Sequence, residues 1–364
     1  MLKYDNEEQL LFQGLTDMIG LLPGAKVWTD EREVRVGTQA RIDALVDVTI
    51  DGRPLRLVVE AKRQAYPRDV RQAIYQLRQY IAQLPATDVH ELVPFFMANS
   101  ISPGARDLLR EERIGFYDLG GSLFIPANHA FILIDRPPPP AAARNLDRIF
   151  QGQRARVVME VVERRPEWLG VKGVAEATGV SPATASATLS EMERREWVEV
   201  EGAGPAKLRR LRDPAPVIDA WASAIAERKP PALTRYYVPV GDVGALARRL
   251  DAACTQAGAV YAVTSEVAAQ AYAPHLSSIS QLRCRIAPGP GQDAALAELD
   301  ARRVKEGWNL GVLETRAASD VIVGPRIDGV TLAPALQVYL DLLQGSGRAR
   351  DMAAHLRAER LERA

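Results

Sequence analysis

The chain has 364 residues, of which 47% are hydrophobic, enough for two or three packed domains. Lys and Arg together number 46, as do Asp and Glu, which disfavours a protein that coats DNA over its whole surface. Cys254 and Cys284 lie far apart and form no metal motif, the N-terminus lacks an apolar signal core, and no apolar stretch has membrane-spanning length. We therefore expect a cytoplasmic protein with no membrane partner, disulfide scaffold or zinc site.

Two proline-rich breaks divide the sequence into three parts. The run Pro137–Pro140 cannot continue a helix or a central strand, and Pro230-Pro231 forms a second break. We predict a first domain at residues 1–135, a linker at 136–150, a second domain at 151–228 and a third at 232–364. The whole is expected to be an α/β and α+β multidomain protein.

The first part alternates strands and helices, which indicates an α/β domain. The hydrophobic spacing predicts, in chain order, a helix at 6–21, strands at 40–50 and 54–62, a helix at 70–84, a strand at 92–98, a helix at 105–112 and a strand at 122–125.

The hairpin formed by the first two of these strands carries the clearest chemical pattern. Asp51-Gly52 is a strong type I′ turn signal, and the register it sets places Asp43 opposite Glu60. Because side chains alternate along a strand, Asp43, Glu60 and Lys62 should share one face. Adjacent carboxylates repel each other without a cation, and hard oxygen ligands suit Mg²⁺ or Mn²⁺. A lysine beside such a metal can orient a water or stabilise charge on a phosphate.

Two other interpretations of the hairpin remain open. Asp43 and Glu60 can be ordinary strand residues, with Asp47 and Arg56 forming a cross-strand ion pair nearer the turn. Alternatively, the site belongs to a domain that binds DNA without cutting it, since a fold does not imply a function.

Residues 5–130 resemble the PD-(D/E)XK nuclease fold, with Asp43 followed by Glu60-Ala61-Lys62 as its E-x-K element. The resemblance implies Asp43, Glu60 and Lys62 as catalytic residues, with Mg²⁺ or Mn²⁺ as the cofactor. Gln76, in Gln72-Ala73-Ile74-Tyr75-Gln76, matches the glutamine that many members place near the metal. Glu8 matches the additional acid of some members. Ile42 departs from the family's proline.

The second part has the punctuation of a winged helix-turn-helix. A helix at 154–165 is followed by a short helix, then by Gly179, which suits the positive φ of the turn, and Ser181 as the N-cap of a helix at 182–195. A short hairpin follows, with basic residues on its second strand. The stretch resembles winged helices of bacterial regulators such as the MarR group. The candidate contacts to duplex DNA are Ser181, Thr184, Ser186, Thr188, Lys207, Arg209 and Arg210. The alternative is a helical subdomain or a protein-interaction module.

The third part is mixed and carries no visible catalytic cluster. Strands are predicted at 236–240, 260–263, 281–286 and 320–323, and helices at 243–257, 266–272, 332–343 and 351–360. This pattern indicates a mixed α/β interaction or dimerisation module, so the chain is a candidate homodimer.

The order of the pieces resembles the AbiEi-type antitoxin and transcriptional-regulator family. The matching stretches are residues 115–121, the winged helix, the helix within 264–272 and the tail at 337–356. The resemblance implies a repressor of its own operon, paired with a nucleotidyltransferase-like toxin as its partner. Two hypotheses follow: a DNA-binding regulator or antitoxin, and a metal-dependent DNA endonuclease targeted by its winged helix.

Overall fold

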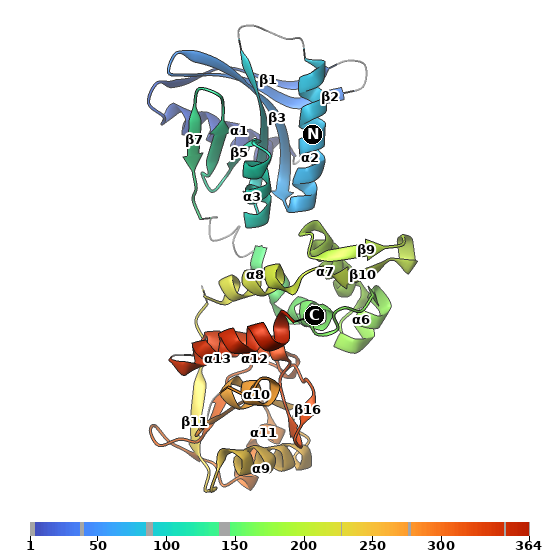
Figure 1. The fold of residues 1–364 in the computed structure, drawn as a ribbon, viewed down its shortest axis with the longest axis vertical. Coiled ribbons are helices and arrows are strands. Elements are labelled where there is room, and N and C mark those ends of the chain that lie inside the picture. Colours follow the sequence, from blue (N-terminus) through green and yellow to red (C-terminus); the bar gives the residue numbers. More distant parts are fainter. Residues whose placement is uncertain are drawn as a thin grey trace. The chain divides into compact units, whose positions relative to one another are not determined.

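The computed structural model describes residues 4–36, 40–84, 90–137, 146–226, 228–275, 278–345 and 347–363. The chain divides into two compact units with a boundary near residue 146. Most of the linker expected at 136–150, namely residues 138–145, lies outside the described residues. Each unit is described by itself (Figure 1).

The N-terminal unit is a seven-stranded mixed sheet with the strand order β1-β2-β3-β4-β5-β6-β7. The pairs β3–β4 and β4–β5 are parallel, and the other neighbouring pairs are antiparallel. The elements are α1 (Tyr4–Gly20), β1 (Ala25–Val36), β2 (Ala40–Ile50), β3 (Arg53–Ala65), α2 (Pro67–Gln83), β4 (Glu91–Ile101), α3 (Pro103–Glu111), β5 (Gly115–Asp118), β6 (Leu123–Pro126) and β7 (Phe131–Ile134).

Helices cover both faces of this sheet. Phe12 and Leu15 of α1 pack with Val59 and its alternate neighbours in one hydrophobic cluster. Val70 and Leu77 of α2, together with α3, pack against the opposite face in a second cluster. The strands are apolar on both faces because both faces are covered, as expected for an α/β domain.

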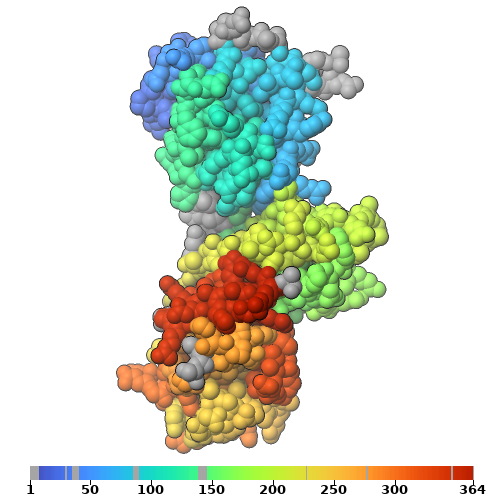
Figure 2. Space-filling view, viewed as in Figure 1, coloured from blue at the N-terminus to red at the C-terminus, as the bar shows by residue number. Residues whose placement is uncertain are grey.

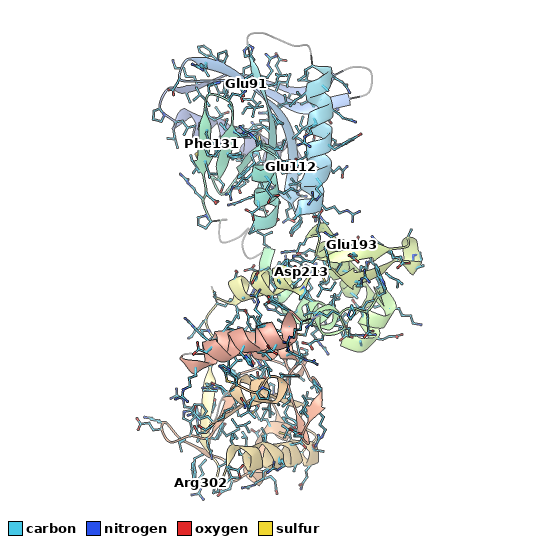
Figure 3. All side chains as sticks on the ribbon, viewed as in Figure 1. Glu91, Glu112, Phe131, Glu193, Asp213 and Arg302 are labelled. Carbon is cyan, nitrogen blue, oxygen red and sulfur yellow. The ribbon has the colours of Figure 1, made fainter. Side chains whose placement is uncertain are left out.

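Three strands of this unit were not expected from the sequence. β1 has charged residues and a Trp28 that is 66% exposed, so it lacks the apolar alternation of a buried strand. β5 and β7 are only four residues long. Phe131 of β7, labelled in Figure 3, is 70% exposed at the end of the sheet. Edge and short strands bury few residues, and their patterns are correspondingly weak.

The second unit begins with a winged helix-turn-helix. Its three-stranded sheet has the order β8-β10-β9. The elements are η1 (Asp147–Phe150), α5 (Gly152–Glu163), β8 (Leu169–Gly170), α6 (Val171–Thr178), α7 (Pro182–Arg194), β9 (Val198–Glu201), η2 (Gly204–Ala206), β10 (Leu208–Leu211) and α8 (Pro214–Ala226).

The rest of this unit is built around a five-stranded sheet of order β12-β13-β15-β11-β14, in which only β13–β15 is a parallel pair. β16 and β17 form a small hairpin. The elements are β11 (Leu233–Tyr237), α9 (Val243–Gln256), β12 (Tyr261–Thr264), α10 (Ser265–Tyr272), β13 (Leu282–Ile286), α11 (Pro290–Glu298), β14 (Arg302–Arg303), β15 (Leu310–Leu313), η3 (Ala318–Asp320), β16 (Arg326–Ile327), β17 (Val330–Thr331), α12 (Ala335–Leu343), α13 (Arg348–Leu356) and η4 (Arg357–Leu361).

The strand expected at residues 320–323 is wrong. Asp320 ends the short helical turn η3, where its carboxylate accepts the backbone N–H groups of Arg316 and Ala317. This local bonding competes with strand formation, as is usual for aspartate. The central strand is instead β15, at residues 310–313.

The winged helix and the C-terminal part share one hydrophobic core. The cluster runs from Phe150 and Val157 through Trp221 to Leu336 and Leu340. Figure 2 shows the red C-terminal helices packed directly against the yellow and green segments of this unit. The packing of the winged helix therefore depends partly on side chains of the C-terminal part.

Candidate functional site

The turn of the β2–β3 hairpin has the expected type I′ geometry. Asp51 and Gly52 both have positive φ, 50° and 77°. The turn pairs Ile50 with Arg53, and the same register continues along the hairpin. Asp47 lies opposite Arg56 and accepts two hydrogen bonds from its guanidinium, at 2.6 and 2.8 Å, as expected for the ion pair near the turn.

The ladder between β2 and β3 ends at Ala44 and Val59, one residue before Asp43 and Glu60. Both strands continue beyond this point with their outer neighbours, so β2 and β3 separate there. The Oδ2 atom of Asp43 accepts the backbone N–H of Ala61 at 2.8 Å, which holds this carboxylate beside Glu60. The Nζ atom of Lys62 donates to Oε1 of Glu60 at 2.6 Å.

These three charges are electrostatically coupled. Burial raises the pKa of Glu60; the hydrogen bond from Lys62 opposes this rise, and the charge of Asp43 adds to it. Burial alone would lower the pKa of Lys62, but the hydrogen bond to Glu60 and the charges of Glu60 and Asp43 outweigh it, so its pKa is raised. A buried carboxylate beside a second one is a good ligand for a cation, because the cation offsets both the cost of burying the charge and the repulsion between the two carboxylates.

Helix α2 closes the site from the side. Tyr80 packs against the hydrophobic cluster on this face of the sheet; burial raises its pKa, and the charges of Glu60 and Asp43 raise it further. Gln76 lies one turn earlier on the same helix, and its Oε1 is buried with no hydrogen-bond partner among the described residues. An unsatisfied buried carbonyl oxygen is uncommon and suits a bound ligand or water. Tyr80 was not expected from the sequence, although its i+4 spacing from Gln76 could have indicated it.

Two further residues that the nuclease-fold resemblance involves have exposed side chains. Glu8 is exposed on α1, and Gln72 is exposed on α2. Within the described ranges, no three His, Cys, Asp or Glu side chains are grouped so as to hold a metal ion. The donor set is thus two carboxylates, which fits Mg²⁺, because this ion is commonly held by one or two carboxylates and keeps several waters.

The helix-turn-helix follows the punctuation expected from the sequence. Gly179 ends α6 in the left-handed conformation, with φ of 67°. The Oγ of Ser181 accepts the backbone N–H of Thr184 at 3.1 Å, which is the N-cap bond of α7. Leu189 and Met192 on the inner face of α7 are fully buried.

The outer face of α7 differs in part from the expected DNA-contact set. Ser181 is exposed and Thr184 is partly exposed at the start of the helix. Thr188 is fully buried, and its hydroxyl donates to the carbonyl oxygen of Thr184 at 2.8 Å. It therefore cannot reach a base edge, because its hydroxyl is bonded back to the preceding turn. Ser186 is partly exposed, like Thr184, and lines a cavity between α6, α7 and the wing.

The wing is less basic on its surface than its sequence suggests. Arg209 is only 5% exposed and donates to the carbonyl oxygen of Lys207 at 3.1 Å. Arg210 pairs with Glu199 across the hairpin at 2.5 Å and stacks over the ring of Trp168. Lys207 is partly exposed. The expectation that Arg209 faces a phosphate is therefore wrong: its side chain turns inward beside α6 and α7.

None of the helices that the structure describes is long and apolar enough to cross a membrane.

A model of the IclR helix-turn-helix domain matches residues 153–202, and no curated protein matches the chain. The chain is distantly similar to a repair endonuclease from Pyrococcus abyssi, at 23% identity over 33% of this chain and 48% of that one, with a TM-score of 0.24. It is also similar to EndoMS in a complex with double-stranded DNA, at 24% identity over 35% and 48% of the two chains, with a TM-score of 0.24. It is similar to EndoMS in its apo form at 21% identity over 33% of this chain and 48% of that one, with a TM-score of 0.22. The chain thus spans about half the length of these proteins. Residues 153–202 are thus a helix-turn-helix DNA-binding domain of the IclR type.

Proposed function

We propose that this chain binds duplex DNA through its winged helix and cleaves it with a Mg²⁺- or Mn²⁺-dependent site of the PD-(D/E)XK type in its N-terminal unit. The observation that carries the proposal is the meeting of Asp43 and Glu60 where β2 and β3 separate, with Lys62 bonded to Glu60. Opposed carboxylates at the end of a ladder leave room for a cation and a phosphate, which a continuous ladder would not.

Each residue has a distinct role in this proposal. Asp43 and Glu60 bind the cation, and the N–H of Ala61 fixes the orientation of Asp43. The cation, when bound, activates a water and polarises the phosphodiester. Lys62, 44% exposed at its side chain, turns from Glu60 toward the phosphate and stabilises its developing negative charge. Gln76 offers its unpaired Oε1 to the attacking water.

The exposed hydroxyls at the start of α7 would read the major groove in this proposal. Ser181 and Thr184 are the members of the expected set that are accessible on α7. Lys207 and Arg210 are the partly exposed basic residues of the wing; Lys207 would contact a phosphate, whereas Arg210 is paired with Glu199.

A second candidate function is a transcriptional regulator related to the AbiEi-type antitoxins, in which the N-terminal site binds DNA without cutting it. The helix-turn-helix domain at residues 153–202 favours this reading, because such domains commonly serve regulators. Its partner would be a nucleotidyltransferase-like toxin encoded alongside, and the chain would act as a homodimer on a palindromic operator.

One experiment separates the two functions. Full-length protein is incubated with a duplex DNA library and plasmid in EDTA, Mg²⁺ or Mn²⁺, and both the mobility shift and the strand breaks are scored. A nuclease shifts DNA in EDTA and cuts it only with metal. The Lys62→Met variant should shift DNA normally but not cut it, whereas Lys26→Met, on the exposed surface of β1, should cut like the parent. A sequence-specific mobility shift with no strand breaks in Mg²⁺ or Mn²⁺ would reject the nuclease and support the transcriptional regulator.

A further inference from the structure

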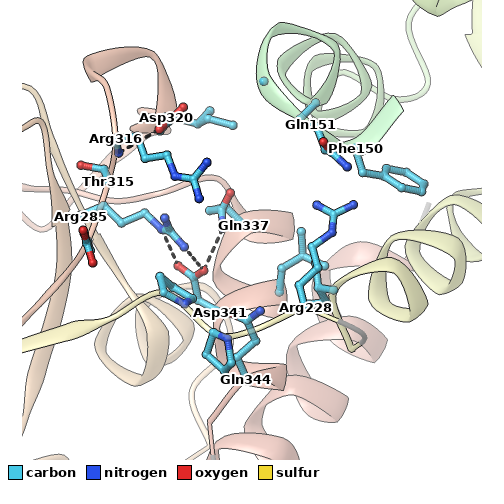
Figure 4. A pocket seen from close by; sticks show the side chains of 18 of the residues that line it. Phe150, Gln151, Arg228, Arg285, Thr315, Arg316, Asp320, Gln337, Asp341 and Gln344 are labelled. Carbon is cyan, nitrogen blue, oxygen red and sulfur yellow. Dashed lines mark hydrogen bonds and ion pairs between the residues drawn. The ribbon is translucent and has the colours of Figure 1, made fainter. Parts of the chain in front are cut away.

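A large cavity lies within the second unit, between the winged helix and the C-terminal part. Its volume is about 820 Å³, within the range of small-molecule sites. One wall comes from η1, α5 and α8, and the other from β13, the segment after β15, and α12. Figure 4 shows Arg228 and Arg316 extending from opposite walls into the space between them.

The cavity is lined by five cations and three carboxylates, so its walls carry an excess of positive charge. Asp341 is paired with Arg285, which donates to it at 2.6 and 3.0 Å, and it also accepts the hydroxyl of Thr264 at 2.6 Å. The other two carboxylates are Asp320, which accepts two backbone N–H groups of its own turn and keeps its charge, and the exposed Glu314.

By contrast, three cations of the lining have no carboxylate partner among the residues described. They are Arg156 of α5, Lys229 after α8, and Arg316 after β15. Unpaired cations that line one concave site favour a bound anion.

The remaining lining suits an organic ligand rather than a bare ion. The partly exposed Ile225, Pro231 and Ile322 supply apolar surface, and Gln151 and Gln344 add amide groups. Gln337 donates its amide N–H to Asp341 at 2.9 Å. Sites for organic ligands combine an apolar wall with a few polar groups in this way.

We propose that this cavity binds an organic anion of mononucleotide size and that its occupancy sets the DNA affinity of the winged helix. The anionic end lies among Arg316, Arg156 and Lys229, and the apolar part lies against Ile225. Because Arg156 is on α5 and Arg316 is on the C-terminal part, an anion bound to both joins the first helix of the winged helix to the C-terminal fold. The effect on DNA rests on the proposed DNA binding, whereas the site itself does not.

The first test measures ligand binding alone, without DNA or metal. Fluorescent N-methylanthraniloyl-AMP is titrated into the full-length chain, and a Kd below about 1 mM is expected. Arg316→Glu should weaken binding by about 10-fold or more, since it removes a charge-assisted contact and adds repulsion. Arg303→Glu, an exposed arginine on β14 away from the cavity, is the matched control and should bind like the parent. Thermal melts of both variants check that the fold is kept.

Competition distinguishes the sources of the anion. Unlabelled AMP should displace the probe and adenosine should not, because the cations hold the charged group. Displacement by citrate as well as by AMP would widen the ligand class to multivalent organic anions in general. No binding of the probe, equal displacement by adenosine, or an Arg316→Glu variant that binds like the parent would overturn the site.

The second test measures the coupling to DNA. Saturating AMP should change the DNA affinity of the parent by about fivefold or more, and DNA should change the affinity for AMP by the same factor. The shift should be lost in Arg316→Glu and kept in Arg303→Glu. If the probe binds but DNA affinity stays unchanged, the regulatory role is overturned and the site stands. If the parent binds no DNA at all, the proposed function fails, while the binding measurement still decides the cavity.

Discussion

The hydrogen bond that holds Asp43 allows its structural and metal-binding roles to be separated. Replacing Asp43 with Ala leaves the N–H of Ala61 without its 2.8 Å acceptor. A buried donor left without its acceptor costs about 1–3 kcal/mol of stability; the Ala61 N–H is only partly buried, so we expect the lower end, and relief of the repulsion with Glu60 offsets part of it. Asp43→Asn keeps an acceptor oxygen, so its cost should stay below about 1 kcal/mol. Both variants remove one of the two carboxylates that would bind the metal.

The assay combines urea unfolding with calorimetric titration of Mn²⁺. Asp43→Asn should unfold close to the parent and yet bind Mn²⁺ at least about 100-fold more weakly, which corresponds to about 2.7 kcal/mol. Asp47→Asn is the matched control: it removes the carboxylate that pairs with Arg56 near the turn and should leave Mn²⁺ binding unchanged. Parent-like Mn²⁺ binding by Asp43→Asn would refute the metal site. Equal stability of the Ala and Asn variants would refute the role assigned to the Ala61 hydrogen bond.

Three further predictions concern the second unit. Leu189→Ala should destabilise it by about 2–5 kcal/mol in thermal or urea unfolding, since the side chain is fully buried, and a cost under about 1 kcal/mol would contradict the packing of α7. Ser181→Ala should cost about 1 kcal/mol through loss of the N-cap and should weaken DNA binding, whereas Thr188→Val should leave DNA sequence preference unchanged; a binding-site selection in which only Thr188→Val alters preference would reverse this assignment. The backbone N–H of Leu336 donates to Oε1 of Glu163 at 3.1 Å, so Glu163→Ala, which removes this acceptor, should cost about 1 kcal/mol in urea unfolding, whereas Glu163→Gln, which keeps an acceptor oxygen, should stay close to the parent. Equal stability of the Ala and Gln variants would contradict the role assigned to this hydrogen bond.

Local rules predicted the hairpin and the helix-turn-helix because each depends on short-range chemistry. The Asp51-Gly52 turn sets the register of β2 and β3 without help from the rest of the fold. Gly179 and Ser181 likewise mark the turn between α6 and α7 within three residues. The functional roles of the residues in both places stay predictions.

Side-chain direction on the wing and the recognition helix could not be predicted in the same way. Arg209 and Arg210 alternate on a strand, so one must turn inward, and the pattern of neighbouring charges does not say which. Thr188 is polar, yet it lies at the i+3 position from the buried Ala185 and continues its stripe. Tertiary burial decided both cases. β1 was missed because an edge strand buries few side chains, so its sequence lacks the apolar alternation that predicts a strand.

The continuous core of the second unit has a consequence for the use of its parts. Phe150 stacks on Trp197 of the winged helix and on Trp221 of α8, and the same cluster continues into α12. Cutting the chain after α8 would remove the apolar side chains of α12 from this aromatic stack and would expose the remaining rings to water. We therefore expect the winged helix to aggregate when it is fused by itself to another protein, because it would expose apolar core surface. A transplant that keeps its solubility has to carry residues 147–363 as one piece.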